Sequence, residues 1–576
     1  MTKMIDKKHF QQLADIVGED FFSAEGYMTH LYSHDIAALP GIVNDVMNTQ
    51  AEAIAQPTTS EILSNLLKFC KKENIPVIPR GHGTSGYGGA LPTKGGLVIE
   101  MTRINQIFHI NKGAMTVEVG AGIIWGKLLE DLEEEDLTLA AYPSSAPSST
   151  VGGWVAAGGS GIGSTKYGGI REQVVDLEVV LPDGQIIRTE NTPSDFFEDE
   201  TQEPFFKGDE KLQYAADVYN ETDGNMTSLF VDSNGALGII SKVVLKVIPL
   251  RTIKPLLFSF PNQEQTFGAM QEILRLSKPY YLHFITSEFY GMLTEVDHAP
   301  STQNEWLVLC AFEGSEEQTE DEAMRIINAM KMYHATLESE EIAHHEWDER
   351  FYPMRIKRLG PSLAPSEVYV PLNRMDDFID HCNRHFKGER MAIEGAVNNQ
   401  DEVAVLTWFL DDERRRIPFL FGWYRSLDVI NIGVKNGGRA YSIGMWNVAH
   451  SSKFYGKEDY TKMANLKQKT DSKGYLNSHK VFPGPLYLST RIGILIMLAA
   501  GFIVPIAIMF AWWLIPSVLT AYVPWIVVNN LTSFLVWFIV GVLIGFVVQE
   551  FVNLIPISVI LSIGTPFLRF GRKIFH

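Results

Sequence analysis

The 576-residue chain has very few cysteines, no excess of basic residues and a long stretch without any charge. Its three cysteines, Cys70, Cys310 and Cys382, are far apart and form no C-x-x-C pair. Thiolates therefore supply neither an iron–sulfur cluster nor a structural zinc site, and we interpret all three as reduced thiols in a reducing compartment. The formal net charge of −19 argues against nucleic-acid binding, which needs clustered positive charge.

Residues 1–20 contain no apolar run like that of a secretory signal, so no cleavable signal is expected. The C-terminal part differs, because no charged residue occurs from Ile492 to Gln549. About 20 apolar residues suffice to cross a bilayer. The sequence therefore predicts a transmembrane helical hairpin within a membrane anchor at 486–576, with helices at about 492–515 and 526–549 and an interfacial or re-entrant segment at 551–568.

Basic residues flank this apolar region on both sides, with Lys480 and Arg491 before it and Arg569, Arg572 and Lys573 after it. The positive-inside rule places both groups on the cytoplasmic side, which requires an even number of crossings. We therefore expect an integral protein of the cell (inner) membrane whose large N-terminal part faces the cytoplasm.

Residues 79–89, PRGHGTSGYGG, contain a G-x-G-x-x-G pattern, and Glu100 follows 19 residues after its first glycine. This combination is typical of the dinucleotide-binding fingerprint of the doubly wound fold, whose last glycine opens a helix. Here residues 87–96 hold four glycines and a proline, which no helix tolerates. An apolar, β-prone run follows at 97–101, so the order is strand, loop, strand, and the doubly wound fold is excluded.

Such a glycine-rich loop can still direct successive backbone N–H groups into one concavity that binds an anion. Arg80, Thr84 and Ser85 would add donors suited to a diphosphate. The alternative from this stretch alone is a flexible surface loop.

The rest of the chain shows two different patterns. Residues 57–250 predict α/β structure, with a second glycine-dense stretch at 151–170, a hairpin at 176–189 and an acidic surface insertion at 190–230. From about 251 to 430, strands alternate with amphipathic helices, as in an α+β domain with helices on one face of an antiparallel sheet. We divide the chain into a lead-in (1–56), a first domain (57–250), a cap domain (251–430), a return segment (431–485) and the anchor (486–576).

Four stretches together resemble the FAD-binding superfamily of vanillyl-alcohol oxidase and p-cresol methylhydroxylase, near its glycolate oxidase, D-lactate dehydrogenase and alkylglycerone-phosphate synthase branches. They are IPVIPRGHGTS at 75–85, PSSAPSSTVGGWVAAGGSG at 143–161, SNGALGII at 233–240 and DSKGYLNSHKVF at 471–482. The resemblance implies an α+β fold: a two-subdomain FAD-binding domain of the p-cresol methylhydroxylase type, followed by an α+β cap. The glycine loop then becomes a diphosphate site in a fold unrelated to the doubly wound one.

The same resemblance implies the residues that bind FAD. They are Pro79, Arg80, Gly81, His82, Gly83, Thr84, Ser85, Gly86 and Tyr87 in the first loop; Ser144, Ser145, Ser148, Ser149, Thr150, Gly152, Gly153, Ala157, Gly158, Gly159 and Ser160 in the second; and Asn234, Gly235, Ala236, Leu237, Gly238, Ile239 and Ile240 in the third. Some relatives attach flavin covalently through a histidine that would fall at Thr84, so non-covalent FAD is expected here.

The chain departs from the family where 2-hydroxyacid enzymes carry a metal-binding, histidine-rich stretch. Residues 441–447, YSIGMWN, replace one of its motifs, and we found no counterpart of the other. A divalent metal needs several convergent His or carboxylate ligands. The pair His344-His345 points two ways from one backbone, so no metal site is expected.

Residues 347–360, WDERFYPMRIKRLG, resemble the family's W-x-x-R region and offer Arg350, Arg355 and Arg358 for binding an anionic substrate. An arginine can hold a carboxylate with two parallel hydrogen bonds. We name Arg355, Tyr441 and His450 as the candidate catalytic residues, the last two from the segment that faces the flavin in relatives.

These observations predict a membrane-anchored FAD-dependent dehydrogenase. It would oxidise a small organic substrate, best a 2-hydroxyacid such as lactate or glycolate, and pass electrons to quinone or a partner redox subunit. Two alternatives remain: an alkylglycerone-phosphate synthase-like flavin transferase, and a flavin-bearing scaffold subunit of a membrane complex.

Overall fold

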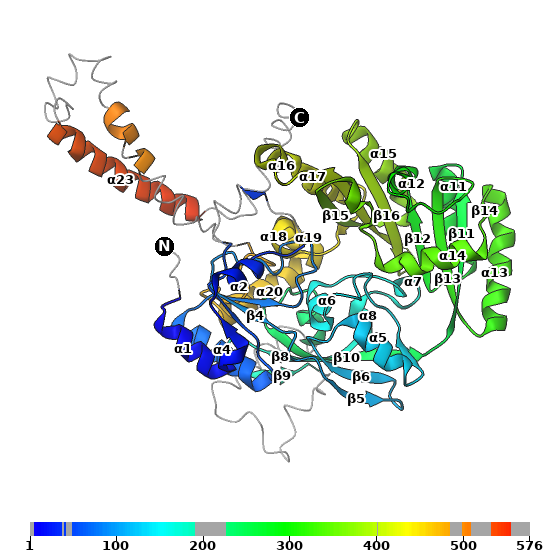
Figure 1. The fold of residues 1–576 in the computed structure, drawn as a ribbon, viewed down its shortest axis with the longest axis horizontal. Coiled ribbons are helices and arrows are strands. Elements are labelled where there is room, and N and C mark those ends of the chain that lie inside the picture. Colours follow the sequence, from blue (N-terminus) through cyan, green and yellow to red (C-terminus); the bar gives the residue numbers. More distant parts are fainter. Residues whose placement is uncertain are drawn as a thin grey trace.

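The computed structural model describes residues 5–36, 40–41, 49–189, 226–399, 401–483, 498–500, 502–507 and 531–554. These residues build three β-sheets that follow one another along the chain (Figure 1). The first two sheets lie in the N-terminal half, and the third and largest forms the cap. The predicted acidic insertion at 190–230 lies almost wholly outside the described residues.

The first sheet has the order β1-β2-β4-β3, with bounds Phe22–Ser23, Ala53–Ala55, Leu97–Glu100 and Val77–Arg80. Strands β3 and β4 are parallel although no helix connects them, because the glycine-rich loop between them makes the crossover. Helix α4 (Ser60–Glu73) packs on this sheet; the Thr59 side chain caps its N-terminus, and Asn74 ends it in the left-handed conformation. The strand–loop–strand prediction is confirmed.

The predicted lead-in at 1–56 is not separate from the first domain. It supplies β1 and β2 to the first sheet. Its helix α1 (Lys8–Val17) buries Leu13 and Val17 in the same core as α4. Helix α2 (Gly26–Leu31) follows. The sequence did not indicate this, because the short strand β2 has no partner near it in the chain.

The second sheet has the order β5-β6-β10-β8-β9, and β7 also pairs with β10. Its strands are Ile107–Asn111 (β5), Thr116–Gly120 (β6), Leu137–Leu139 (β7), Val174–Val180 (β8), Ile186–Arg188 (β9) and Ile239–Pro249 (β10). The predicted hairpin at 176–189 is confirmed as β8 and β9. Its helices are α5 (Trp125–Glu133), α6 (Val151–Ala157), α7 (Ser164–Tyr167), α8 (Ile170–Gln173) and α10 (Met226–Phe230).

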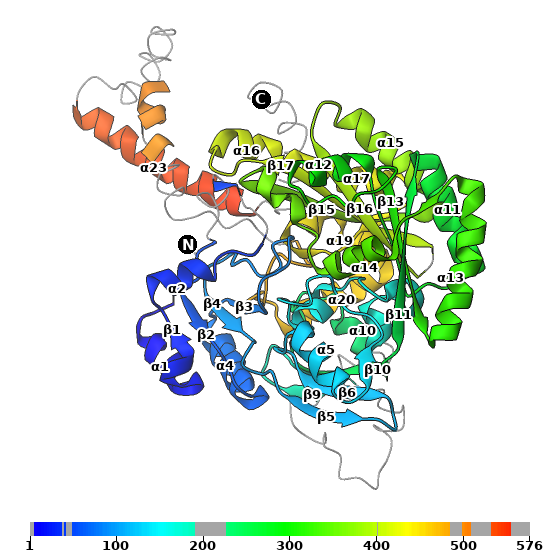
Figure 2. The same ribbon diagram turned by 45° about the vertical axis from the view of Figure 1, so that its right-hand side comes forward.

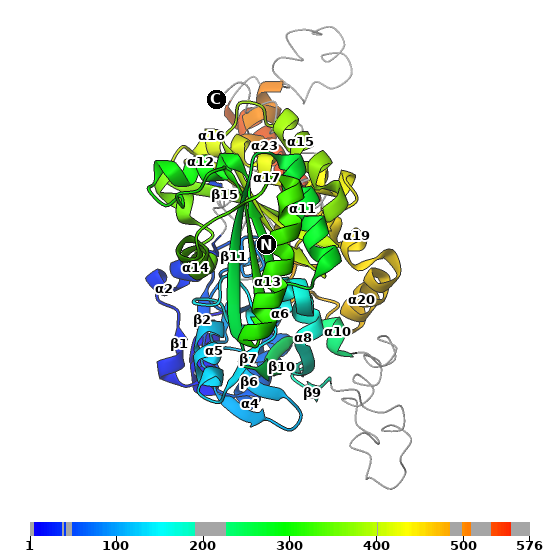
Figure 3. The ribbon, with the colours of Figure 1, turned by 90° about the vertical axis from the view of Figure 1, so that its right-hand side faces the viewer.

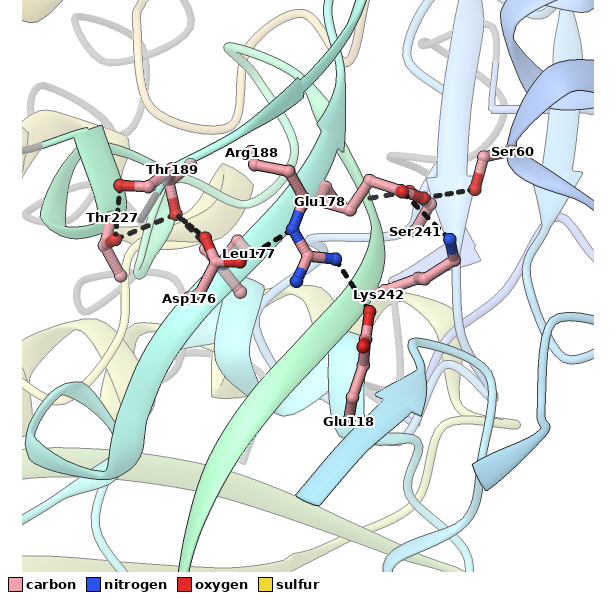
Figure 4. A network of polar contacts seen from close by, with 10 residues as sticks. All are labelled: Ser60, Glu118, Asp176, Leu177, Glu178, Arg188, Thr189, Thr227, Ser241 and Lys242. Carbon is pink, nitrogen blue, oxygen red and sulfur yellow. Dashed lines mark hydrogen bonds and ion pairs between the residues drawn. The ribbon is translucent and has the colours of Figure 1, made fainter. Parts of the chain in front are cut away.

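A polar network joins helix α4, which packs on the first sheet, to the second sheet (Figure 4). Glu178 on β8 accepts hydrogen bonds from Ser60 at the start of α4 and from Ser241 and Lys242 on β10. Burial alone would raise the pKa of Glu178, but these three hydrogen bonds lower it below its ordinary value. Arg188 continues the network by bridging two carboxylates of the second sheet, Glu118 and Asp176.

The cap is one antiparallel sheet of eight strands in the order β14-β11-β13-β12-β16-β17-β15-β18. Their bounds are Thr336–Leu337 (β14), Thr252–Phe260 (β11), Trp306–Gly314 (β13), Tyr281–Ile285 (β12), Met391–Asn398 (β16), Glu402–Asp411 (β17), Ser362–Pro371 (β15) and Arg439–Ala440 (β18). The last strand comes from the predicted return segment, which therefore completes the cap as well.

The sequence pattern predicted that the helices of the cap lie on one face of its sheet. This prediction is wrong, because helices pack on both faces. One face packs against α11 (Gln263–Leu276), α13 (Glu316–Met330), α15 (Met375–His385) and α17 (Tyr424–Lys435) in a separate apolar core. The other face shares a continuous core with the second sheet, α12 (Ser287–Glu295) and α14 (Glu340–Asp348). Figure 3 shows α13 and α14 on opposite sides of β11. The second face is therefore the one that meets the first domain.

The return segment runs back along the first domain (Figure 2). Helix α16 (Arg416–Gly422) precedes it, and after β18 it forms α18 (Gly444–Asn447), α19 (Ser451–Tyr455) and α20 (Lys457–Thr470). Leu476 forms a parallel bridge with Val77 at the edge of the first sheet. Lys467 is buried and donates to Asp471, Ala236 and Leu476, which fixes this segment to the third glycine-containing loop.

Helix α23 (Leu531–Leu554) lies near the C-terminus and extends away from the other elements (Figures 1 and 2). Among the residues that the structure describes, none of the helices was found to combine the length and hydropathy needed to cross a membrane. The predicted transmembrane hairpin at 492–515 and 526–549 is therefore not supported by the structure. Much of it, and the whole segment 555–576, lies outside the described residues.

Candidate active site

The first and second glycine loops lie against each other. An added Cβ at Gly81 would stand 2.2 Å from the hydroxyl oxygen of Thr150, so only glycine allows this approach. Thr150 itself caps helix α6 by accepting from the backbone N–H of Gly153. The ring of His82 lies 2.7 Å from the carbonyl oxygen of Ser148. Two motifs that lie far apart in the chain thus form one surface.

The third loop and the closing stretch complete that surface. Asn477 donates from its amide to the carbonyl oxygens of Gly89 and Asn234, and Asn234 donates from its backbone to Ala156. Gly235 has φ of +66°, and an added Cβ would stand 2.7 Å from the ring of Pro79. All four stretches that carry the resemblance therefore meet in space.

The second loop also contacts the cap through Tyr441. The phenol oxygen accepts from the backbone N–H of Ser160 at 3.1 Å and donates to the Ser160 carbonyl at 2.8 Å. Gly159 must be glycine here, because its Cβ would lie 2.4 Å from that phenol oxygen. Tyr369 stacks on Tyr441 and donates to the Ser160 hydroxyl at 3.1 Å. Tyr441 therefore holds the loop in place.

These loops fit a flavin dinucleotide. Residues 81–86 present backbone and hydroxyl groups that are partly accessible, and the neighbouring glycines keep side chains out of the cradle. The hydroxyl of Ser145 donates to that of Ser149 in the second loop. The neighbouring Ser148 contacts the first loop through its carbonyl oxygen, which lies beside the ring of His82. The predicted FAD-binding residues thus lie in one connected region, at the ends of β3 and β10 and around α6.

Arg80 differs from the expected free donor. Burial lowers its pKa, and its guanidinium donates to the carbonyl oxygen of His34 at 2.6 Å and lies over the ring of Tyr32. The backbone N–H of Ile36 also donates to the Gly83 carbonyl. The N-terminal segment 32–36 therefore covers one side of the first glycine loop.

Between the second loop and the cap sheet lies a cavity of about 110 Å³, which we call the cap cavity. Its loop side includes Ser144, Ser160 and Tyr441, and its other wall is formed by cap strands and by the segment after α14. The ionisable groups that line it are Tyr281, His283, Glu346, Glu349, Arg350, Tyr352, Arg355, Glu367, Glu394 and Tyr441.

Two of the predicted arginines, Arg350 and Arg355, line the cap cavity, and they differ in how their guanidinium groups are paired. Arg355 on the 3₁₀ helix η4 (Arg355–Leu359) makes a two-pronged pair with Glu346, both at 3.2 Å and both only 8% exposed. Arg350 on η3 (Glu349–Phe351) lies over the rings of Trp347 and Phe351. Its buried Nε has no hydrogen-bond partner among the described residues. Its Nη1 donates to the Trp347 carbonyl at 2.7 Å and lies 3.9 Å from the exposed Asp348 carboxylate, so Arg350 is the less tightly paired of the two arginines.

The cap strands place two carboxylates on one face of the sheet, with Leu406 between them. The sheet register puts Glu367 (β15), Leu406 (β17), Glu394 (β16) and Ile285 (β12) in one row across the sheet, and therefore on one face. Burial raises the pKa of Glu367 to about 7, even though Tyr87 donates to this carboxyl. Glu394 accepts from the indole N–H of Trp408 at 2.9 Å and lies 3.3 Å from the ring of His283.

Sequence reasoning missed His283, Glu367 and Glu394. Each sits alone in an apolar strand, at an inward position of the alternating pattern where an aliphatic residue would be expected. That alternation was the only clue available in the sequence. His450, which the sequence did suggest, ends the one-turn helix η6 (Val448–His450) and does not line the cap cavity; burial lowers its pKa.

A second cavity of about 470 Å³ also includes Tyr441 in its lining, together with Gly159, Tyr369, Arg439 and Tyr455. Its arginines are paired: Arg439 with Glu402 at 3.0 Å, and Arg171 with Asp232 at 2.6 Å. Within the described ranges, no group of three or more His, Cys, Asp or Glu side chains is placed to hold a metal ion.

The two glycine-loop subdomains with a cap sheet closing over them define a flavin-binding oxidoreductase. Residues 51–190 match the FAD binding domain, and residues 251–481 match the C-terminal domain of FAD linked oxidases. Both matched domains are those of FAD-linked oxidases, and the chain is an FAD-dependent oxidoreductase.

Among similar sequences, glycolate oxidase subunit GlcD from Bacillus subtilis is 28% identical, over 66% of this chain and 76% of that protein. The D-lactate dehydrogenase of Anaerostipes hadrus is 28% identical over 50% and 57%. Alkyldihydroxyacetonephosphate synthase from Trypanosoma brucei brucei is 23% identical over 84% and 82%. Among solved structures, p-cresol methylhydroxylase with substrate bound shares the fold, with a TM-score of 0.66, 16% identity and coverage of 82% and 96%.

Proposed function

We propose that the protein oxidises a small 2-hydroxyacid to the corresponding keto acid, with FAD as the first electron acceptor. The observation that carries this proposal is Arg350, a half-buried cation that lines a small cavity beside the second flavin loop and whose Nε–H has no hydrogen-bond partner among the described residues. A guanidinium with spare donors binds a carboxylate well. The similarity to glycolate oxidase subunit GlcD and to D-lactate dehydrogenase supports the same substrate class.

Bound FAD would supply the hydride acceptor. The protein would orient the substrate against the flavin and tune the reactivity of the flavin. The loops around Gly81 and Thr150 would hold the diphosphate. Tyr441 would keep the second loop, and with it the cavity wall, at a fixed distance. The cavity of about 110 Å³ suits a substrate of a few heavy atoms, such as lactate or glycolate, better than a long-chain one.

The test is anaerobic mixing of the purified, FAD-loaded protein with a panel of 2-hydroxyacids, with both stereoisomers of each chiral one. Loss of the oxidised flavin absorbance on addition of at least one of them, and formation of one keto acid per flavin, is the expected result. An alcohol without the carboxylate serves as the control, and it should leave the flavin oxidised. Failure of all the hydroxyacids would reject the proposal.

The transferase alternative is supported by the match to alkyldihydroxyacetonephosphate synthase, which covers more of this chain than the other two sequences. A transferase of that kind would leave the flavin oxidised at the end of each turnover. Flavin reduction that accumulates with a hydroxyacid therefore separates the two functions. A scaffold subunit would show neither flavin reduction nor transfer.

We further propose that the C-terminal region attaches the enzyme to the cytoplasmic face of the cell membrane and that electrons leave to quinone or a partner subunit. The support is the uncharged run from Ile492 to Gln549 together with exposed apolar side chains along α23. These side chains are Leu535, Val536, Ile539, Leu543, Ile544, Val547 and Val548. Release from membranes by alkaline carbonate, without detergent, would contradict this attachment.

A further inference from the structure

We infer that His283 and Glu394 form the catalytic proton-accepting pair of the cap cavity, an inference that rests on the proposed function. His283 would take the proton of the substrate hydroxyl, and Glu394 would hold the imidazole and stabilise its charged form. A histidine oriented by a buried carboxylate is a well-known arrangement for a general base. Neither residue belongs to the flavin loops, and both come from the cap.

The geometry of the pair is the first support. The ring of His283 lies 3.3 Å from one carboxylate oxygen of Glu394, and the indole of Trp408 donates to the other oxygen at 2.9 Å. Glu394 is therefore fixed on both sides. The ring of Tyr281 stacks nearly parallel to that of His283, at an interplanar angle of 9°, which also limits its rotation. The His283 side chain lines the cavity and remains 18% exposed.

The register of the sheet is the second support. His283 on β12 lies opposite Ala396 on β16, and Ala396 lies opposite Ala404 on β17. Small side chains thus stand on the β16 side of the imidazole and leave it room to meet a ligand there, while Leu309 on β13 lies on its other side. Glu394 is two residues from Ala396 and so faces the same side.

The other groups that face the cavity are poorly suited to accept a proton. Burial raises the pKa of Tyr281 and of Tyr441 far above neutrality, so both phenols stay protonated. Glu346 is occupied by Arg355, and the arginines remain charged. Glu367 already accepts from Tyr87, and burial raises its pKa to about 7, so much of it is protonated at neutral pH. Glu349 and Tyr352 belong to the segment after α14 that carries Arg350, and not to the strands that carry His283 and Glu394.

Atoms and electrons balance in this step. The hydroxyl O–H bond breaks and its proton goes to His283. Bound FAD would accept the C–H hydrogen with its electron pair, and the carbon–oxygen bond would become a carbonyl. Arg350 on the segment after α14 would hold the substrate carboxylate meanwhile. The proton on His283 would then leave to solvent, and the electron pair taken up by FAD would pass to the acceptor.

The test compares His283→Gln and Glu394→Gln in the full-length, FAD-loaded protein, with His344→Gln on the exposed face of α14 as the matched control. Three quantities are measured: the rate of anaerobic flavin reduction by the best hydroxyacid, the dissociation constant of oxalate as a substrate mimic, and the rate of flavin reduction by dithionite. We expect His283→Gln to slow substrate reduction by about 1000-fold and Glu394→Gln by about 30-fold. Oxalate binding and dithionite reduction should stay within about threefold of wild type.

Imidazole rescue gives a second, independent readout. Added imidazole should restore part of the substrate reduction rate to His283→Ala and none to Glu394→Gln. Glu394→Asp should recover part of the loss in Glu394→Gln. If wild type reduces with a hydroxyacid but His283→Gln keeps its rate within about tenfold, or if only Glu367→Gln loses it, the pair is wrong and the proposed function stands. If no hydroxyacid reduces the wild-type flavin, the proposed function is rejected, and the catalytic role of His283 and Glu394 is rejected with it.

Discussion

The flavin loops and the cap cavity are built in opposite ways. Each flavin loop is a short local stretch whose conformation depends on its own glycines, as at Gly81 and Gly159. The cap cavity takes single residues from strands that are far apart in the chain, such as His283, Glu367 and Glu394. Cofactor binding therefore depends on glycines, whose missing side chains allow close backbone approach. Substrate chemistry depends on a few particular side chains that line the cap cavity. Substitutions should affect the two regions differently.

The largest effect is expected at the flavin loops. Gly81→Val would put carbon atoms where the Thr150 hydroxyl now lies, so Thr150 would have to leave the cap of α6. We expect the purified variant to contain less than about a tenth of the wild-type flavin. Flavin content is read from the absorbance after denaturation. Gly291→Val is the control, because a Cβ there meets no atom within 4 Å; equal flavin in both variants would contradict the role of this close approach.

The next effect concerns the carboxyl of Glu367. Burial raises its pKa from the ordinary 4.5 to about 7, so folding takes up a proton between these values. The contribution of this proton uptake to the free energy of unfolding is fully present below pH 4.5 and is lost as the pH rises through 7. It amounts to at most about 3 kcal/mol. We expect Glu367→Gln to remove this dependence from the unfolding midpoint measured at several pH values. Glu340→Gln on the exposed end of α14 should keep it.

A smaller effect is expected for Arg350, which acts on the substrate and not on the cofactor. Arg350→Gln should lower kcat/KM for the best hydroxyacid by about 30-fold, mostly through a higher KM, because one charged hydrogen-bonding group is lost. Flavin content should not change. Arg358→Gln, which alters an exposed arginine of the same segment, is the control. An unchanged KM in Arg350→Gln would mean that the carboxylate binds elsewhere.

The smallest effect is expected for His450. Its position in the sequence suggested a catalytic role, but its side chain does not line the cap cavity. His450→Asn should keep kcat/KM within about twofold of wild type in steady-state assays. A loss of about 100-fold or more would show that the return segment contributes to catalysis after all, and that the cap does not supply the chemistry alone.

Much of the fold could be predicted because the determining features were local. The helix after Thr59, the hairpin with its turn at 182–184 and the strand–loop–strand arrangement around the first glycines all follow from neighbouring residues. The contribution of residues 22–23 and 53–55 to the first sheet could not be predicted, because their partners lie far away in sequence. The same applies to β18, which joins the cap sheet from the return segment.

The sequence by itself determined the cofactor class. Glycine at 81, 83, 152 and 159 reports on backbone conformation and close approach, which are properties of the residue and its neighbours. Tertiary structure alone decided which arginine is less tightly paired, because buried Glu346 holds Arg355 with two hydrogen bonds, whereas Arg350 lies 3.9 Å from the exposed Asp348 carboxylate. It also decided that His283 meets Glu394, because that contact depends on β12 and β16 being neighbours although 111 residues separate the pair. Charge pairing and strand order are long-range properties, and no local pattern encodes them.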